Sequence, residues 1–341
     1  MERTNQDVSK LLACPDCKGS LSFTTNNKEL ECKKCLRKFD VLKDNFFILL
    51  PKDISAKKKE IMDWWGNNKP DLDAYVVGSE NTEEGSWEYY KNTDRKWFKH
   101  FHPWASTKFP ILHKWIDYDS LLNKKVLEVG CGIGTMFEQF SGMGIECHAL
   151  ELNYPCACLA QKRTELNNFK GKGNVYQGDG ENLPFKNNSF DYILSYGVLH
   201  HSEDTQKAFN ELHRVLKPGG KFLVMVYNKD SINYWWHIIF GWGILKGKLL
   251  KMTPRQLTAL RSDRNYQGGN PKADFLSKKE LRKMFNKFSK IELYPTGPLD
   301  QIKLLPWSKL PLAKFIVPNF IAQKLVDKYG KLIYIIGEKD K

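Results

Sequence analysis

Short apolar runs alternate with amphipathic segments along residues 116–230 of the 341-residue chain. Five of these runs have strand length, and they lie at residues 125–129, 146–151, 174–177, 190–195 and 222–226. Apolar residues recur at helical spacing from Thr205 to Leu216, and Lys217–Gly220 ends that segment because proline and glycine do not continue a helix. Alternating strands and helices predict an α/β fold on a parallel sheet.

The C-terminal third adds a few more elements to this pattern. Ser277–Glu280 has the sequence of a capping box, and apolar residues follow it at helical spacing as far as Phe288. Two further strands are predicted at 291–294 and 332–336. We therefore expect three segments, which are a cysteine-containing segment at 1–51, a linker with an aromatic helical segment at 52–115, and an α/β domain at 116–341 with insertions at 231–276 and 297–330.

Composition adds an uneven distribution of charge to this picture. The net charge is +14, and residues 231–341 hold 21 Lys and Arg against 8 Asp and Glu, so that this third carries nearly all of the excess. A basic region of this kind favours an anionic partner, which can be a membrane surface, a phosphorylated substrate or a nucleic acid. RNA is the less favoured partner, because only four of the 21 basic residues are arginine, the better side chain for reading phosphates and bases.

Residues 231–252 place aromatic side chains before lysines. The aromatic residues are Trp235, Trp236, Phe240 and Trp242, and the lysines are Lys246, Lys248 and Lys251. This order fits an interfacial contact with an anionic membrane, or alternatively a helix that packs on the core. The longest apolar stretch, Ile238–Leu245, is far shorter than the roughly 20 residues of a bilayer span, and the first ten residues lack the apolar run of a signal peptide. We expect a cytoplasmic protein that can lie peripherally on a membrane.

Glycines follow the first predicted strand in the sequence Glu128–Gly134. Glycines at 130, 132 and 134 allow the backbone to turn tightly and to approach a ligand closely. Glu151 ends the next strand, where a carboxylate can bind both ribose hydroxyls of a nucleotide, and Asp179 follows the third strand. A nicotinamide-binding enzyme is less favoured, since its third glycine would come one residue later.

The segments VLEVGCGIG, ALEL, GDGENLPF, FDYILSYGVLHH and LKPGG together resemble the class I S-adenosylmethionine-dependent methyltransferases, in particular the ubiquinone/menaquinone branch. The resemblance implies a Rossmann-like sheet of seven mostly parallel strands with the last strand antiparallel. It also implies S-adenosylmethionine as the cofactor. The residues that it assigns to the cofactor are Glu128 at the methionine end, Gly130, Gly132 and Gly134 in the loop, Glu151 at the ribose, Asp179, Gly180 and Glu181 at the adenine, and Ser195.

A pair of histidines, His200 and His201, follows the fourth strand, at the edge of the sheet where ligands bind in open α/β folds. Methyl transfer to a hydroxyl or a carbon acid requires a base, and histidine has a suitable pKa. Either histidine is therefore a candidate catalytic base, although both can instead line the pocket or be structural. His100 and His102 lie just before the α/β domain, and the aromatic residues of the same segment can close over the substrate or belong to the core, namely Tyr89, Tyr90 and Trp97.

Four cysteines form the pattern Cys14-x-x-Cys17 and Cys32-x-x-Cys35, with 14 residues between the two pairs. Two thiolate pairs on tight turns make a closed tetrahedral site that suits structural Zn²⁺, while iron or a disulfide pair are alternatives. Residues 11–50 resemble the zinc ribbons of a methyltransferase activator subunit and of bacterial rRNA guanine-N1 methyltransferases. The other cysteines are expected to pack as small apolar residues, and these are Cys131, Cys147, Cys156 and Cys158.

The sequence thus predicts an S-adenosylmethionine-dependent methyltransferase with an N-terminal zinc ribbon. The predicted acceptor is a small metabolite, a glycan precursor or a lipid-like molecule. One alternative is an RNA methyltransferase that docks through its ribbon and its basic C-terminal face, and the other is a cofactor-binding scaffold without activity. No oligomeric state is predicted.

Overall fold

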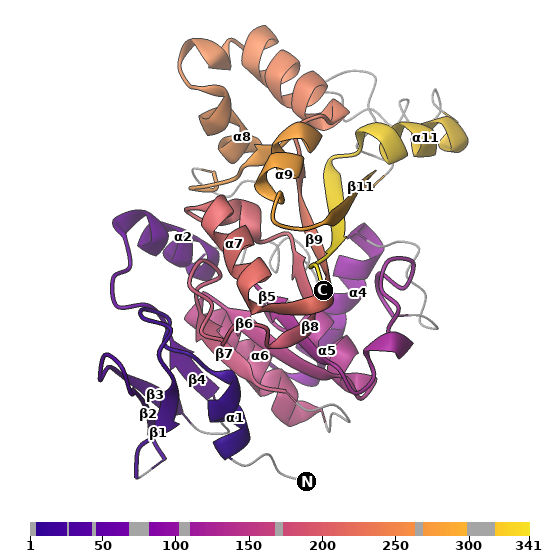
Figure 1. Ribbon diagram of the computed structural model, residues 1–341. Coiled ribbons are helices and arrows are strands. Elements are labelled where there is room, and N and C mark those ends of the chain that lie inside the picture. The colour runs from indigo at the N-terminus through magenta and orange to yellow at the C-terminus, as the bar shows by residue number, and fades with distance from the viewer. Residues whose placement is uncertain are drawn as a thin grey trace.

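The computed structural model describes residues 5–25, 27–42, 46–67, 82–101, 110–167, 173–262, 269–298 and 318–341. A single twisted sheet runs through it, in the strand order β1-β2-β3-β4-β7-β6-β5-β8-β9-β12-β11 (Figure 1). Seven strands form its main part, and these are β5 (Lys125–Val129), β6 (Glu146–Glu151), β7 (Val175–Gly178), β8 (Phe190–Tyr196), β9 (Leu216–Asn228), β11 (Lys290–Thr296) and β12 (Leu332–Glu338). β5 to β9 pair in parallel and β12 pairs antiparallel with β9 and β11, which confirms the predicted sheet.

Alternating side chains divide the core between the two faces of this sheet. On β9, Phe222, Val224 and Val226 belong to one buried cluster, and the intervening Leu223 and Met225 belong to the other. α7 (Thr205–Val215) and α9 (Lys278–Met284) cover the first face, while α5 (Thr135–Gly142) and α6 (Tyr154–Leu166) cover the second. The strand period of two therefore buries apolar side chains on both faces.

The cysteine-rich segment continues the main sheet at its β7 edge. Its elements are α1 (Asn5–Leu11), β1 (Leu21–Phe23), β2 (Glu29–Cys32), β3 (Lys38–Leu42) and β4 (Phe46–Leu49). β4 pairs in parallel with β7, and the fully buried Phe47 ring stacks on Tyr176 at 5.4 Å. The ribbon and the α/β domain thus share one sheet and one hydrophobic core.

The remaining elements lie before the main sheet or extend it. They are α2 (Ala56–Asn67), α4 (Trp87–Phe101), η2 (Asp119–Leu121), η3 (Leu199–His201), the π-helix η4 (Asn233–Leu245), η5 (Lys248–Leu250), α8 (Pro254–Ser262), β10 (Phe275–Leu276) and α11 (Asn319–Tyr329). In α4, Tyr89 and Tyr90 are buried against Ile133 and Leu159, so both belong to the core. The side chains of Trp97 and His100, all of His102, and most of the insertion at 297–330 lie outside the described residues.

Three elements differ from the sequence-based expectation. β9 begins at Leu216, before the predicted Phe222, because Leu216 pairs with Phe190 and the N–H of Gly219 donates to the carbonyl of Lys339. The helix with the capping box at Ser277 and Glu280 is present but ends at Met284, and the π-helical form of η4 was not predicted. Among the described residues, no helix combines the length and the apolar character that a membrane span requires.

Candidate functional site

The carboxyl ends of four neighbouring strands gather most of the residues assigned to the cofactor. Glu128 of β5 lies in register with Ala149 of β6 and with Leu194 of β8, and Glu151 of β6 with Gln177 of β7. Because these strands are parallel, the loops that leave them meet at one edge of the sheet. Ligands of open α/β folds bind at such an edge.

The loop after β5 has the backbone conformation that its glycines allow. Gly130, Gly132 and Gly134 all have positive φ, at 79°, 53° and 83°. A Cβ atom on Gly130 would lie 2.4 Å from the methyl carbons of Val198, so a side chain at this position would collide with the loop after β8. Only glycine therefore fits at position 130, where the loop after β5 and the loop after β8 come into close contact.

The Glu151 carboxylate holds this glycine loop in place. Its Oε2 accepts a hydrogen bond from the N–H of Gly132 at 2.9 Å, and its Oε1 accepts one from the N–H of Asn153 at 2.9 Å. Burial raises the pKa of Glu151, and the hydrogen bonds from the backbone oppose that rise. Glu151 therefore shapes the loop, and its expected contact with a ribose remains a prediction.

Glu128 is a buried carboxyl group with an unused acceptor. Its side chain is 3% exposed, and among the described residues no hydrogen-bond partner reaches Oε2. Burial, and to a smaller extent the charge of Glu151, raises the pKa of Glu128 well above its usual range. A buried polar atom of this kind is costly unless a ligand satisfies it, and an ammonium group would do so. Glu128 thus offers an acceptor for a donor group of a ligand, and its expected contact with the methionine end of the cofactor remains a prediction.

Ser195 is fully buried where β8 passes β5. Its Oγ donates a hydrogen bond to the carbonyl of Val129 at 3.0 Å. The hydroxyl therefore joins the two strands just before the glycine loop. Its predicted role at the cofactor remains a prediction.

The acidic residues after β7 already have a partner that the sequence analysis missed. Lys58 of α2 places its Nζ 2.5 Å from Oδ2 of Asp179 and 3.0 Å from Oε2 of Glu181, and its side chain is only 7% exposed. Burial alone would lower the pKa of Lys58, but the two carboxylates outweigh burial and raise it. The signal in the sequence was helical spacing, since Lys58 shares one face of α2 with the buried Ile61 and with Trp65.

Helix α2 lies across this edge of the sheet. Its Trp65 ring meets the ring of His201 edge-on at 5.0 Å. The Met62 carbonyl accepts a hydrogen bond from Nδ2 of Asn153 at 3.0 Å, and Ser55, just before the helix, donates to Glu203 at 2.5 Å. The helix thus contacts the loops after β6, β7 and β8.

The two histidines after β8 have different surroundings. His201 Nδ1 donates to the carbonyl of Lys272 at 2.7 Å, which fixes its proton and its orientation. His200 is fully buried with its ring 4.3 Å from that of Tyr227, and neither of its nitrogens has a hydrogen-bond partner among the described residues. Burial first, and then the charges of His201, Lys272 and Lys331, lower the pKa of His200 well below its usual range. The imidazole of His200 is therefore neutral at neutral pH.

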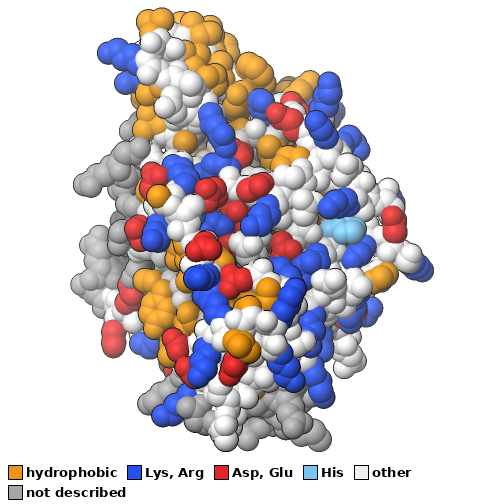
Figure 2. Space-filling view, turned by 60° about the vertical axis from the view of Figure 1, so that its left-hand side comes forward, with side chains coloured by type: hydrophobic (Ala, Val, Ile, Leu, Met, Phe, Trp, Pro, Cys, Tyr) orange, Lys and Arg blue, Asp and Glu red, His pale blue; other side chains and the backbone are white. Residues whose placement is uncertain are grey.

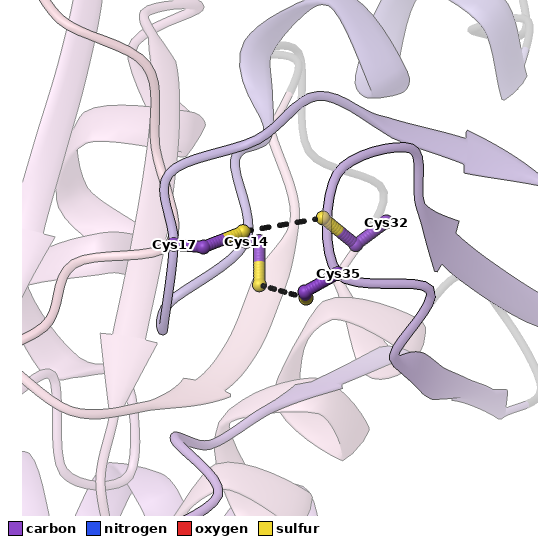
Figure 3. Close-up of side chains that lie close together, drawn as sticks. All are labelled: Cys14, Cys17, Cys32 and Cys35. Carbon is purple, nitrogen blue, oxygen red and sulfur yellow. Dashed lines mark hydrogen bonds between the residues drawn. The ribbon is translucent and has the colours of Figure 1, made fainter.

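The four cysteines of the ribbon converge on one point, as Figure 3 shows. Their sulfur atoms all lie within 4.8 Å of one another, with 3.7 Å between Cys14 and Cys35 and 3.5 Å between Cys17 and Cys32. A tetrahedral zinc ion with Zn–S bonds of about 2.3 Å places its sulfurs about 3.8 Å apart. The donor set therefore fits a structural Zn²⁺, and the separations exceed a disulfide bond.

The metal site is tied directly to the segment that carries the acidic pair. Lys18, next to Cys17, forms an ion pair with Glu211 of α7 at 3.0 Å. The N–H of Ala13 donates to the carbonyl of Pro184, and the N–H of Lys186 donates to the carbonyl of Leu11, at 3.0 Å each. The ribbon therefore supports the loop from Asp179 to Lys186 from one side.

Comparison with known protein families identifies the domain to which this edge of the sheet belongs. Residues 127–224, from β5 into β9, match the family model of the methyltransferase domain. The chain contains a class I S-adenosylmethionine-dependent methyltransferase domain. Residues 6–42 match the family model of Trm112p-like proteins, so the methyltransferase domain is preceded by a Trm112-like region whose four cysteines fit structural zinc.

Three curated relatives each match about a third of the chain. Norajmaline N-methyltransferase of Rauvolfia serpentina is 30% identical over 118 residues, which cover 34% of this chain and 40% of that protein. Phosphoethanolamine N-methyltransferase 2 of Caenorhabditis elegans is 34% identical over 106 residues, covering 30% of this chain and 24% of the relative. The ubiquinone/menaquinone biosynthesis C-methyltransferase of Idiomarina loihiensis is 37% identical over 108 residues, covering 31% and 43%. The chain thus spans less than half the length of these relatives.

Solved structures with a similar arrangement include phosphoethanolamine N-methyltransferase 2 of Haemonchus contortus. That structure has a TM-score of 0.49 and 17% identity, and the match covers 85% of this chain and 61% of that chain. A complex of the Haloferax volcanii Trm112 activator with its putative methyltransferase has a TM-score of 0.42 and 15% identity, and the match covers 64% and 84%. Both scores lie below 0.5, so the assignment of the domain rests on the sequence matches.

Proposed function

We propose that this protein transfers a methyl group from S-adenosylmethionine to a small metabolite, a glycan precursor or a lipid-like acceptor. The observation that carries the proposal is the buried Glu128 carboxylate beside the glycine loop, with one oxygen that no described residue satisfies. S-adenosylmethionine, when bound, supplies a methyl group on a positively charged sulfur. The backbone of Gly130–Gly134, with Glu128 at one side and Asp179 at the other, would hold it.

The acceptor side of the site favours a small molecule over RNA. His200 and His201 are both buried, and α2 lies over them through Trp65. An enclosed site of this kind suits a compact acceptor directly, whereas an RNA base would first have to be flipped out of its stack to enter it. The names of the curated relatives include an N-methyltransferase that acts on phosphoethanolamine and a C-methyltransferase of ubiquinone/menaquinone biosynthesis. We therefore propose a class of acceptor and not an acceptor atom.

Of the two histidines, we assign the proton-accepting role to His200. Its nitrogens have no partner among the described residues, and burial keeps the ring neutral, so one nitrogen has a lone pair that can take a proton. Because burial also weakens the ring as a base, the proposed proton transfer is expected only while the acceptor is being methylated, when its proton becomes acidic. His201 has its Nδ1 hydrogen bonded to the Lys272 carbonyl, so we assign it the role of a positioning residue that packs between α2 and His200. Methyl transfer gains most from such positioning of the reacting groups.

Calorimetric titration of the full chain with S-adenosylmethionine tests the cofactor part of the proposal. We expect binding, and we expect Glu128→Gln to weaken it about tenfold or more, because a hydrogen bond to a charged group is worth roughly 1.5–3 kcal/mol. Glu146→Gln, at the opposite end of the neighbouring strand β6, is the matched control and should bind like the wild type. Absence of binding in the wild-type chain would overturn the proposal, whereas binding without any methyl transfer would favour the cofactor-binding scaffold.

The acceptor class is tested with methyl-labelled S-adenosylmethionine and a cell extract separated into water-soluble metabolites, lipids, RNA and protein. We expect the label in the metabolite or lipid fraction. Label that appears only in RNA would establish the alternative in which the ribbon and the basic C-terminal face dock RNA.

A further inference from the structure

The upper end of the molecule carries an apolar surface that the core does not use. Figure 2 shows hydrophobic side chains gathered at this end, which is built by η4, η5 and α8 in Figure 1. Four large apolar residues of this end are exposed, namely Trp235 at 55%, Ile244 at 60%, Leu245 at 50% and Leu250 at 90%. Exposed apolar groups clustered in this way mark an interaction site more often than scattered single residues do.

This end is a packed unit, so the exposure does not arise from a loose segment. Tyr234 and Ile238 of η4 and Leu257 of α8 are buried in the core cluster on the α5 and α6 face. The guanidinium of Arg261 lies 3.8 Å from the ring centroid of Trp242, which joins α8 to η4. Gly247, with φ of 64°, turns the chain between η4 and η5, and Leu250 at the end of η5 is exposed to solvent. The fold therefore holds the apolar side chains outward.

The charged side chains of the segment that carries these apolar residues all have one sign. From Ser231 to Ser262 the chain has five Lys and Arg residues and no Asp or Glu. Arg255 pairs with Asp274 at 3.0 Å, whereas Lys246, Lys248 and Lys251 form no ion pair with any described residue. Three unpaired cations thus flank the four exposed apolar side chains.

We propose that this tip, which we define as residues 235–251, docks on an anionic membrane surface. Apolar side chains beside lysines are the composition that enters the boundary between lipid headgroups and acyl chains, where the lysines meet anionic lipids. A second copy of the chain fits less well, because a symmetric contact would bring the same cations face to face with no acid between them. RNA fits less well, because the most exposed side chains at the tip are aliphatic. Docking would hold the chain at a lipid surface, which would suit a lipid-like acceptor.

Vesicle co-sedimentation of the full chain tests the docking surface. We expect binding to phosphatidylcholine vesicles that contain phosphatidylserine, weakened by salt, and little binding to phosphatidylcholine alone. Lys246→Glu with Lys251→Glu should lower binding at least about tenfold, since one lysine near an anionic surface is worth roughly fivefold. Ile244→Ala with Leu250→Ala should also lower it about tenfold, through lost burial in the lipid.

Matched controls change the same residue types elsewhere. Lys124→Glu with Lys221→Glu reverses two exposed lysines, one just before β5 and one within β9, and Leu122→Ala with Leu166→Ala shortens two exposed leucines. Both control pairs should bind vesicles like the wild type, and all variants should bind S-adenosylmethionine like the wild type if they are folded.

The proposal is overturned if the chain does not bind anionic vesicles at low salt, or if the tip variants and the control variants lose binding equally. Sedimentation velocity that shows a dimer abolished by the Ile244 and Leu250 changes, without vesicle binding, would assign the tip to a second copy instead. Salt-sensitive RNA binding that depends on Lys246 and Lys251, again without vesicle binding, would assign it to RNA. This test is independent of the proposed methyl transfer. If the chain binds vesicles but not S-adenosylmethionine, the proposed function is refuted and the docking surface is not.

Discussion

At the scale of single residues, the candidate site is defined by buried polar atoms that have no hydrogen-bond partner among the described residues. Glu128 and His200 are both of this kind, and each pays an unfavourable desolvation energy that a ligand would relieve. Glu151 and Ser195 lie just as close to the loop, but their polar atoms are bound to Gly132, Asn153 and Val129. The residue types alone did not distinguish these two groups, because the distinction depends on which partners lie within hydrogen-bond distance.

His200 gives a prediction about pH. Its folded-state pKa lies well below 6.5, so as pH falls below about 6.5 the unfolded chain binds a proton that the folded chain refuses, and stability falls. His200→Phe removes this contribution, so the free energy of unfolding of the variant should depend less on pH between 6.5 and 5. The difference approaches about 1.4 kcal/mol per pH unit. Urea unfolding at several pH values measures it.

Values at pH 8 serve as the internal reference for this comparison, because there the two chains differ only in packing. Equal slopes for the wild type and the variant would contradict the assignment of His200 as a buried neutral group. In that case its role as the base would lose its physical support.

At the scale of elements, α2 is the feature that most changes the picture of the site. One face of this helix inserts Lys58 between Asp179 and Glu181 and sets Trp65 against His201. Asp179 is the residue that the family resemblance places opposite the adenine amino group. An ammonium group and an adenine amino group are both donors, so they compete for the same carboxylate oxygens.

This competition gives a prediction for Lys58→Met. Removal of the cation leaves two buried carboxylates unpaired, and loss of one partner of a buried ion pair typically costs about 3–5 kcal/mol of stability. Affinity for S-adenosylmethionine should be equal or higher, since Asp179 becomes available. Thermal unfolding and calorimetry measure the two effects separately.

Lys57→Met is the control, because Lys57 is exposed and, in the part of the chain that the structure describes, forms an ion pair with Glu60 of the same helix and with no other residue. It should change stability by less than about 1 kcal/mol. If Lys58→Met instead lost cofactor affinity while remaining folded, Lys58 would be a residue that holds the acidic pair in place for the cofactor.

At the scale of the whole molecule, the ribbon is a structural part of the methyltransferase domain rather than an attached module. β4 extends the main sheet through β7, and the ribbon supports the loop from Asp179 to Lys186. Metal binding in small ribbons supplies much of their folding free energy. Loss of the metal should therefore also disturb the cofactor site, because the ribbon supports the loop that follows β7.

We accordingly predict one zinc ion per chain, and a single unfolding transition that includes both parts. Chelation should lower the melting temperature by several degrees, because about 1 kcal/mol shifts it by roughly 2–4 °C in a domain of this size, and it should also weaken cofactor binding. Elemental analysis, calorimetry and titration provide the measurements. Cys32→Ser should act like chelation, and Cys158→Ser, outside the cluster, should retain the zinc.

Separate melting of the ribbon, with unchanged cofactor affinity after chelation, would contradict this coupling. It would mean that the pairing of β4 with β7 contributes little to the loop that follows β7.

The sequence by itself determined the parts of this protein that depend on neighbours along the chain. The strands β5 to β8, the helix α7, the capping box at Ser277 and the two cysteine pairs follow from periodicities and spacings of a few residues, and their predictions agree with the structure. Such patterns act within a few residues because backbone hydrogen bonds and tight turns are local.

Only the tertiary structure decided the contacts between distant residues. Lys58 meets Asp179 across 121 positions of sequence, Phe47 stacks on Tyr176, and Leu250 remains outside a core that accepts Leu257. In the sequence, a lysine that becomes buried looks like any other lysine of its basic run, and an exposed leucine looks like a buried one. Burial is a property of the packed molecule and not of the local sequence. Which oxygens of the site are bound, and which apolar side chains reach the surface, is fixed only when the sheet brings those segments together.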